Sequence, residues 1–315
     1  MRKYSIVLPV LFFIVVIGCN TKSRNEPQAL LTAAIELNDY PSASGIEYSG
    51  DKVYVIGDDA NSLLILDTVL NITDSVQLFS FPGKRIPKEV KPDLESMTIA
   101  PDGRLLLFGS GSSSLRNAGW LIDPDTQKKD SIRLDSFYLR LYASFIYVKN
   151  IEGIAALQGS YVLSNRGNKA FKKNYLIFTD TNFWDHPAEA KINTALVNFN
   201  NNDSFFSGIS GLAYSSQSDA LLLTFSTEDT RNAIDDGAIG KSYLGIINDI
   251  STKKKEDTIG PDKIIDLYEI DPRFKGHKIE SVCILKETDK ALQLLLAADN
   301  DNGSSTLFRL AVNKD

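Results

Sequence analysis

Apolar residues in this chain fall into short runs, and Gly, Asp, Asn and Ser separate one run from the next. Residues 52–57, 104–109, 160–164, 220–225 and 292–298 are examples, in which β-branched residues and leucine predominate or alternate with polar residues. Short runs with turn residues between them predict β-strands, and the spacing typical of long helices is nearly absent. The pattern therefore predicts an all-β fold.

A short signature opens five of these runs. It consists of Ser or Glu, then Gly or Ser, then an apolar residue, and it occurs at 44–46, 95–97, 152–154, 210–212 and 280–282. Successive signatures are 51, 57, 58 and 70 residues apart. Two further strands follow each signature, and a weaker fourth strand closes most units, for example at 74–79, 130–135 and 263–270. Four antiparallel strands per repeat predict a β-propeller.

The number of blades follows from the end of the chain. Only 35 residues follow Glu280, which is enough for three strands of a blade but not for four. Residues 29–37 have the pattern of the missing strand and would pair with 305–312, so that the ring closes without an open edge. We therefore predict five blades. A sixth, degenerate blade is the alternative, whereas two β-sandwich domains do not account for the repeated signature.

The N-terminus carries a targeting segment. Residues 1–5 are basic, and the apolar run 6–17 is too short to cross a hydrocarbon core of roughly 30 Å as a helix. The sequence Val16-Ile17-Gly18-Cys19 resembles the lipobox of bacterial lipoproteins. This resemblance implies a signal peptide at 1–18, lipidation of Cys19 and a membrane anchor facing the periplasm. An ordinary secretory signal is the alternative. A polar tether at 19–28 then leads to the propeller at 29–315.

Charge and cysteine content narrow the functional classes. The net charge is −6 without a Lys/Arg-rich block, so we expect no nucleic-acid partner. Once Cys19 is lipidated, Cys283 alone remains and can form no intramolecular disulfide. Cys283 lies in the apolar run 282–285, which favours a buried small hydrophobe over a nucleophile.

Polar residues are predicted to gather at one end of the propeller axis. The residues that open the inner strands and those between the second and third strands share one face of a propeller. Three of the openings are glutamates, Glu95, Glu152 and Glu280, and His277 lies just before the last of them. The loops between the second and third strands add further candidates for ligand binding, namely Asp58, Asp59, Arg116, Asn165, Arg166, Glu228, Arg231 and Asp299.

These residue types suggest a chemistry. Three converging carboxylates repel one another unless a cation, an arginine or a raised pKa neutralises them. Glu95, Glu152 and Glu280 are therefore candidate metal ligands as well as candidate catalytic residues, with Ca²⁺ as the expected cation because it prefers oxygen ligands. His277 is a candidate general acid or base. The alternative is that each glutamate pairs with an arginine or caps the backbone to fix blade packing.

The segments 94–97, 151–154 and 279–282 resemble the Glu-Gly motif of phytase-like esterase propellers and related bacterial extracytoplasmic propellers. The resemblance implies a polar axial pocket, dependence on a divalent cation and action on phosphate or carboxylic esters. Two of the five signatures carry Ser in place of Glu.

Two functions remain open at this point. The first is an anchored propeller that binds a small polar or anionic ligand at its axial mouth, with cation-assisted hydrolysis of a phosphoester or ester. The second is a non-catalytic binding or scaffold propeller for envelope proteins or glycans. The first requires an open mouth with coupled carboxylates, whereas the second predicts an axis filled by Glu–Arg pairs.

Overall fold

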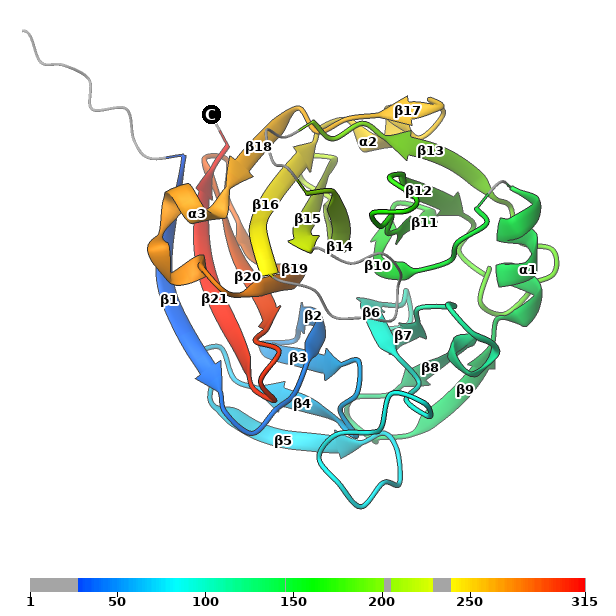
Figure 1. The fold of residues 1–315 in the computed structure, drawn as a ribbon, viewed down its shortest axis with the longest axis horizontal. Helices are drawn as coiled ribbons and strands as arrows, with labels where there is room; N and C mark the ends of the chain where they lie inside the picture. Colours follow the sequence, from blue (N-terminus) through cyan, green and yellow to red (C-terminus); the bar gives the residue numbers. More distant parts are fainter. Residues whose placement is uncertain (1–27, 145, 201–204, 229–238, 315) are drawn as a thin grey trace, which may run out of the picture.

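Each of the five signatures begins or lies in the innermost strand of a separate sheet, and the five sheets stand around one axis as the blades of a β-propeller (Figure 1). The computed structural model describes residues 28–144, 146–200, 205–228 and 239–314. The inner strands are β2 (Ala43–Ser49), β6 (Leu94–Ile99), β10 (Ile151–Leu157), β14 (Ser207–Ser215) and β19 (Lys278–Glu287). The prediction of five blades is confirmed, and the described residues form no sixth sheet.

Most outer strands follow the inner strand of their blade directly in the chain. The first two blades add β3 (Lys52–Gly57), β4 (Ser62–Leu66), β5 (Ile72–Gln77), β7 (Leu105–Gly109), β8 (Ala118–Ile122) and β9 (Lys129–Arg133). The third blade adds β11 (Ser160–Asn165), β12 (Asn174–Thr179), β13 (Asn193–Val197) and the parallel strand β17 (Thr258–Ile259). The last two blades add β15 (Ala220–Glu228), β16 (Ile239–Ile247), β18 (Lys263–Asp266), β20 (Ala291–Asp299) and β21 (Ser305–Asn313).

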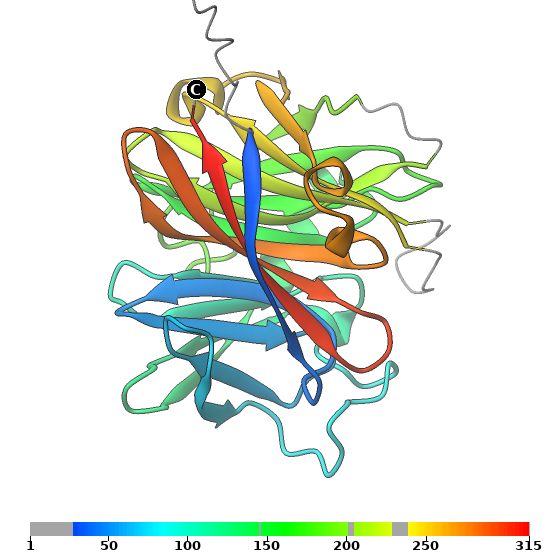
Figure 2. The same ribbon diagram turned by 90° about the vertical axis from the view of Figure 1, so that its left-hand side faces the viewer.

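The N-terminal strand β1 (Ala29–Leu37) closes the ring, as predicted. It lies antiparallel to β21 at the outer edge of the fifth blade, with Ala29 opposite Val312 and Leu37 opposite Ser305. Figure 2 shows the two strands crossing the side of the molecule together. The fifth blade is therefore built from both ends of the described chain, which covers the edge that β21 would otherwise expose.

The signature residues hold neighbouring inner strands together. A Cβ on Gly211 would lie 2.7 Å from the Cα of Ser281 in the next blade, so the backbones approach too closely for a larger residue. The hydroxyl of Ser44 donates to the carbonyl of Leu94, and that of Ser210 donates to the carbonyl of Ile279. Where the signature begins with serine, the side chain thus joins one blade to the next.

The core consists of apolar layers between adjacent blades. Ile56 of the first blade and Leu107 of the second belong to one layer, and Val55 and Leu295 belong to the layer between the first and fifth blades. Because both faces of the second strand of a blade are covered, strands such as β3 and β7 carry nearly continuous apolar sequence. The polar residues near the axis lie at the two ends of the inner strands.

Two of the predicted outer strands end early in short helices. Strand β9 ends at Arg133, and α1 (Asp135–Ala143) follows it with Phe137 and Leu141 buried on one face. Strand β18 ends at Asp266, whose carboxylate accepts from the backbone N–H of Tyr268 and caps α3 (Leu267–Ile270). The prediction of strand over 267–270 is therefore wrong, because the cap supplies a helical partner for the backbone.

The remaining helical segments are single turns, α2 (Ile250–Lys253), η1 (Ser114–Arg116) and η2 (Pro272–Phe274). Within the described ranges, every helix is too short or too polar to cross a lipid bilayer.

Candidate functional site

The inner strands all begin at the same end of the axis, which we call the mouth. Glu95, Glu152 and Glu280 lie at or near the first residue of β6, β10 and β19, and Arg166 follows β11. The Nη1 atom of Arg166 lies 3.3 Å from Glu152 Oε2 and 3.4 Å from Glu280 Oε2. The predicted convergence of these residues is thus observed for the third and fifth blades.

Arg166 reaches across the mouth to three blades. Its Nη2 donates to the Ser226 hydroxyl of the fourth blade at 3.0 Å, in addition to the two glutamates. Gly208 makes room for it, since a Cβ there would lie 2.5 Å from Arg166 Nε. Lys278 Nζ lies 2.8 Å from the other oxygen of Glu280. We call Glu152, Arg166, Lys278 and Glu280 the Arg166 cluster.

The Arg166 cluster is neutralised internally. The side chains of Arg166, Glu152 and Glu280 are 10%, 8% and 6% exposed, so both carboxylates depend on the neighbouring cations. Burial raises the pKa of Glu152, while Arg166 and Lys278 oppose the increase. This arrangement matches the sequence alternative in which Glu–Arg pairs fix the blades.

A second charged group occupies the mouth between the first and second blades. Lys91 Nζ pairs with Asp58 and lies 2.8 Å from Asp93 Oδ1. Arg116 Nη1 lies 2.8 Å from the other oxygen of Asp93 and also donates to the Ser112 hydroxyl at 2.9 Å. We call Asp58, Lys91, Asp93 and Arg116 the Lys91 cluster.

Sequence reasoning missed Lys91 and Asp93. Asp93 lies two residues before Glu95, at the position that Lys278 occupies before Glu280 and Asn150 before Glu152. All three side chains reach the mouth, where Asn150 Nδ2 donates to Glu152 Oε1 at 2.5 Å. The residue two places before each signature was therefore a usable signal. No comparable signal in the sequence marks Lys91, because it lies in the irregular connection before β6.

Burial and electrostatic interactions change the pKa values in the Lys91 cluster. Burial, with further contributions from Asp59 and Asp93, raises the pKa of Asp58 to about 6 against the attraction of Lys91. Although burial favours the neutral amine, the carboxylates of Asp58 and Asp93 raise the pKa of Lys91 above its usual range. Lys91 is therefore a permanent cation between two carboxylates.

Glu95 lies between the two clusters. Burial raises its pKa well above the usual range, and Glu152, Asp93 and Asp58 raise it further, while Lys91 opposes them. Within the described part of the chain, no hydrogen bond or ion pair engages the Glu95 carboxyl. The raised pKa favours the protonated form of Glu95, in which the carboxyl is a hydrogen-bond donor at the axis.

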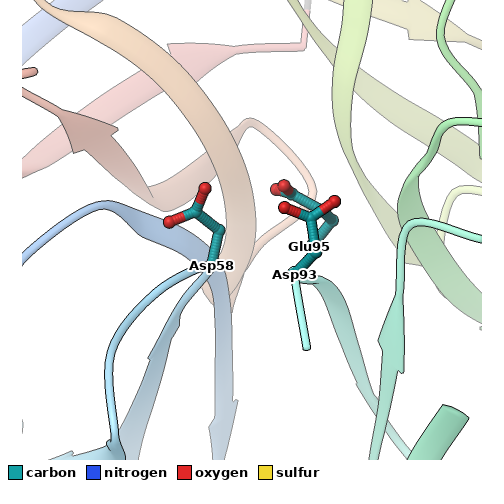
Figure 3. Close-up of side chains that lie close together, drawn as sticks. All are labelled: Asp58, Asp93 and Glu95. Atoms are coloured by element: carbon teal, nitrogen blue, oxygen red, sulfur yellow. The ribbon is translucent and has the colours of Figure 1, made fainter. Parts of the chain in front are cut away.

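The structure gathers a different set of candidate metal ligands from the one predicted. Asp58, Asp93 and Glu95 each offer an oxygen, and these atoms lie within 4.8 Å of one another (Figure 3). Glu152 and Glu280 are instead paired with Arg166. The Lys91 ammonium already contacts two of the three gathered carboxylates, so a cation would compete with it.

Three other predicted residues have structural contacts at the same end. Asp59 is buried and pairs with Arg85 at 2.7 Å. The Asn165 side chain accepts from the backbone N–H of Asn150 at 2.9 Å and donates to the carbonyl of Val148 at 3.1 Å, so it fixes the loop before β10. Asp299 is buried, which raises its pKa to about 6.

Of the remaining predicted residues, only His277 has a side chain that the structure describes. His277 Nδ1 lies 2.7 Å from Asn300 Oδ1, and its ring packs edge-on against Phe308, so its contacts are at the rim of the fifth blade. Glu228 is the last residue of β15, and Arg231 lies outside the described residues.

A cavity of about 590 Å³ lies on the same face, above the third blade. Arg166 and Asn165 line it, and the loop between β11 and β12 contributes Phe171, Lys172 and Lys173. None of the lining residues is acidic. The cavity thus combines three cations with aromatic surface, and Arg166 joins it to the axial clusters. The basic run 169–173 in the sequence was the signal that could have revealed it.

Comparison with known proteins supports the fold. Glutaminyl cyclase from Myxococcus xanthus matches with a TM-score of 0.54 and 11% identity over 91% of this chain and 97% of that one. The major allergen Mala s 1 of Malassezia sympodialis matches with a TM-score of 0.46 and 11% identity over 90% and 96% of the two chains. At 11% identity, the match to the glutaminyl cyclase shows the fold alone.

Sequence comparison gives one family. The sequence model described as a family of unknown function (DUF6929) matches residues 39–312. None of the curated proteins compared with the chain matches it.

Proposed function

Since this chain belongs to the DUF6929 family, whose description assigns no activity, we propose a function from the site itself: the propeller binds a small anionic ligand in the cavity beside Arg166. The observation that carries the proposal is the lining of this cavity. The lining contains no acidic residue and holds Lys172 and Lys173 beside Arg166, whose own charge Glu152 and Glu280 balance, in a protein whose net charge is −6. Positive charge concentrated in one concave site favours a carboxylate or phosphate.

The cavity also fits the organic part of such a ligand. Its volume of about 590 Å³ is in the range of small-molecule sites. Tyr147 and Phe171 leave 55% and 53% of their surface exposed, which provides aromatic contact area at the rim. A planar or apolar group bearing one acidic function therefore satisfies both parts of the lining.

The axial clusters hold the arginine in place. Glu152 and Glu280 contact one nitrogen of Arg166 and Ser226 contacts another, so the guanidinium is oriented before a ligand arrives. Preorganised donors bind an anion with a smaller loss of side-chain entropy. In this proposal the two glutamates are positioning residues for Arg166.

The anion proposal is tested by thermal unfolding of the purified protein with phosphate, citrate, benzoate and phenyl phosphate. A ligand at 100 times its Kd stabilises the fold by about 2.7 kcal/mol, which raises the midpoint by several degrees. The double variant Lys172→Gln/Lys173→Gln should weaken binding at least tenfold, and the exposed Lys290→Gln should leave it unchanged. If no anion stabilises the protein, or if the double variant responds like the wild type, the proposal is wrong.

Cation-assisted hydrolysis of an ester or phosphoester is a second candidate. The proximity of Asp58, Asp93 and Glu95 favours it, because Ca²⁺ prefers carboxylate oxygens and one oxygen of Asp58 is buried without a hydrogen bond. Thermal unfolding with EDTA and then with Ca²⁺ separates the two candidates. A Ca²⁺-dependent rise that Glu95→Gln abolishes supports the metal site, whereas unchanged midpoints in both proteins leave no role for the cation.

We further propose that the propeller is held at the cell envelope through lipidated Cys19, where an envelope protein is a candidate partner. The support is the lipobox-like sequence at 16–19, which lies outside the described residues. The variant Cys19→Ser should move the protein from the membrane fraction to the soluble fraction. Unchanged membrane association would contradict the anchor.

A further inference from the structure

A second cavity lies at the end of the axis opposite to the mouth. Its volume is about 230 Å³, and all five inner strands contribute to its lining. The walls are mixed, with the apolar side chains of Ile99, Ile154, Leu212 and Ile284 beside polar groups that include Glu47 and Thr98. The proposed anion site does not use this end of the axis.

Equivalent positions of the inner strands form a ring at this cavity. The third residue after the first signature residue is Glu47, Thr98, Ala155, Ala213 or Cys283 in the five blades. The first four line the cavity, and Cys283 is buried close enough to Glu47 for the two groups to interact electrostatically. The ring therefore carries a single carboxyl among small and apolar side chains.

Glu47 is a half-buried carboxyl with few partners to compensate its charge. It accepts a hydrogen bond from the backbone N–H of Tyr48 at 3.0 Å. Burial raises its pKa to about 7, and the hydrogen bonds from Tyr48 and Thr98 only partly oppose this. Unlike the carboxylates of the mouth, Glu47 has no cation beside it, because the cavity lining contains no basic residue.

The other titratable groups around the cavity are neutral. Burial raises the pKa of the Cys283 thiol well above its usual range. The Tyr48 and Tyr214 hydroxyls donate to Asp51 and Asp219, each at 3.0 Å, so these hydroxyls are already occupied. Glu47 is thus the group in the cavity that can change charge near neutral pH.

We propose that this cavity binds a small organic amine, with its ammonium group on the Glu47 carboxylate and its hydrocarbon part against Ile99, Ile154 and Leu212. An anion would be repelled by Glu47. A Ca²⁺ ion takes six to eight oxygen ligands, far more than one carboxylate and one hydroxyl provide. The volume is below the roughly 300 Å³ at which drug-sized pockets begin, so the ligand is an amine of a few carbon atoms.

Binding should depend on pH through Glu47. An alkylammonium ion stays charged below pH 9, whereas a carboxyl with a pKa of about 7 is mostly protonated at pH 5.5. The carboxylate fraction rises about 30-fold between pH 5.5 and pH 8.5. We therefore expect an affinity about 30-fold higher at the upper pH.

The test is isothermal titration calorimetry of the purified protein with n-butylamine, with n-butanol as the neutral probe. Wild type should bind the amine at pH 8.5 about 30-fold more tightly than at pH 5.5. Glu47→Gln keeps the shape of the side chain and should lose at least tenfold in affinity. Ala156→Leu keeps the carboxyl but fills the cavity and should also lose binding, whereas Glu269→Gln changes an exposed carboxyl elsewhere and should bind like the wild type.

Several results would overturn the proposal. The first is that wild type does not bind the amine at pH 8.5. The second is that butylamine and butanol bind equally well. The third is that folded Ala156→Leu binds the amine with an affinity within threefold of that of wild type. Thermal unfolding of each variant shows whether it is folded. Should Glu47→Gln fail to fold, the pH dependence of wild type and the Ala156→Leu variant still decide the question.

Discussion

Replacing Arg166 by leucine removes a charge that two buried carboxylates share. In the wild type one nitrogen of Arg166 lies 3.3 Å from Glu152 and 3.4 Å from Glu280. Glu280 keeps Lys278 at 2.8 Å after the substitution. Glu152 keeps a neutral hydrogen bond from the side chain of Asn150 and the longer-range attraction of Lys278, but no direct ion pair. The main consequence is therefore one poorly compensated carboxylate at Glu152.

The size of the effect follows from burial. Breaking a buried ion pair by removing one partner costs about 3–5 kcal/mol, and the remaining Lys278 and Asn150 contacts place this case at the lower end. A loss of about 3 kcal/mol corresponds to a fall in Tm of roughly 6–12 °C for a protein of this size. We therefore expect Arg166→Leu to fold but to melt well below the wild type at pH 8.

The effect should depend on pH. Burial already raises the pKa of Glu152 in the presence of Arg166, and without the guanidinium it rises further. When the pKa of a carboxyl is higher in the folded state than in the unfolded state, the folded protein becomes less stable as pH rises from the unfolded pKa to the folded pKa. The difference between variant and wild type should therefore be less than half as large at pH 5 as at pH 8.

Circular dichroism melts at the two pH values measure this difference. Adding Glu152→Gln to the Arg166→Leu variant removes the poorly compensated charge and should recover at least a third of the lost Tm at pH 8. A fall of less than 2 °C at pH 8, or an equal fall at pH 5, would show that the Arg166 cluster does not stabilise the mouth as described.

Two further predictions concern the blades. Gly211→Ala should lower Tm by several degrees, because the new Cβ would lie 2.7 Å from the backbone of Ser281. Gly103→Ala lies in an open turn, so it should lower Tm only by the strain of a positive φ at alanine. Equal Tm values for the two variants would contradict the packing role of Gly211. Cys283 should react with a thiol reagent only after denaturation, because burial raises its pKa well above the usual range, and rapid labelling of the native protein would refute this.

The architecture was predictable because its signals are local and repeated. Ser44 and Ser210 recur at equivalent positions, since each joins one inner strand to the next by the same hydrogen bond. Helix α1 was missed because its buried face is small, with Phe137 and Leu141 as two of its few anchors. The residues after Asp266 were misassigned because an alternating apolar pattern does not reveal a capping hydrogen bond.

The candidate site was predictable only in part. Residues that open the inner strands reach the mouth by backbone geometry, which is why Glu95 and Glu152 were found. Lys91 was not, because its contact with Asp58 depends on the path of an irregular connection between two blades. Glu47 was overlooked because one carboxyl within a buried strand resembles no motif, and its significance comes from four other strands.

The strand that completes the ring also sets an order of events in folding. β1 is the first described strand to leave the ribosome, yet its partner β21 is the last, and Thr32 donates to the carbonyl of Arg309, 277 residues away. Closing so long a loop costs conformational entropy, and contacts so distant in sequence slow folding. We therefore expect four blades to form along the growing chain, while the fifth blade forms only after β21 has been synthesised and can pair with β1.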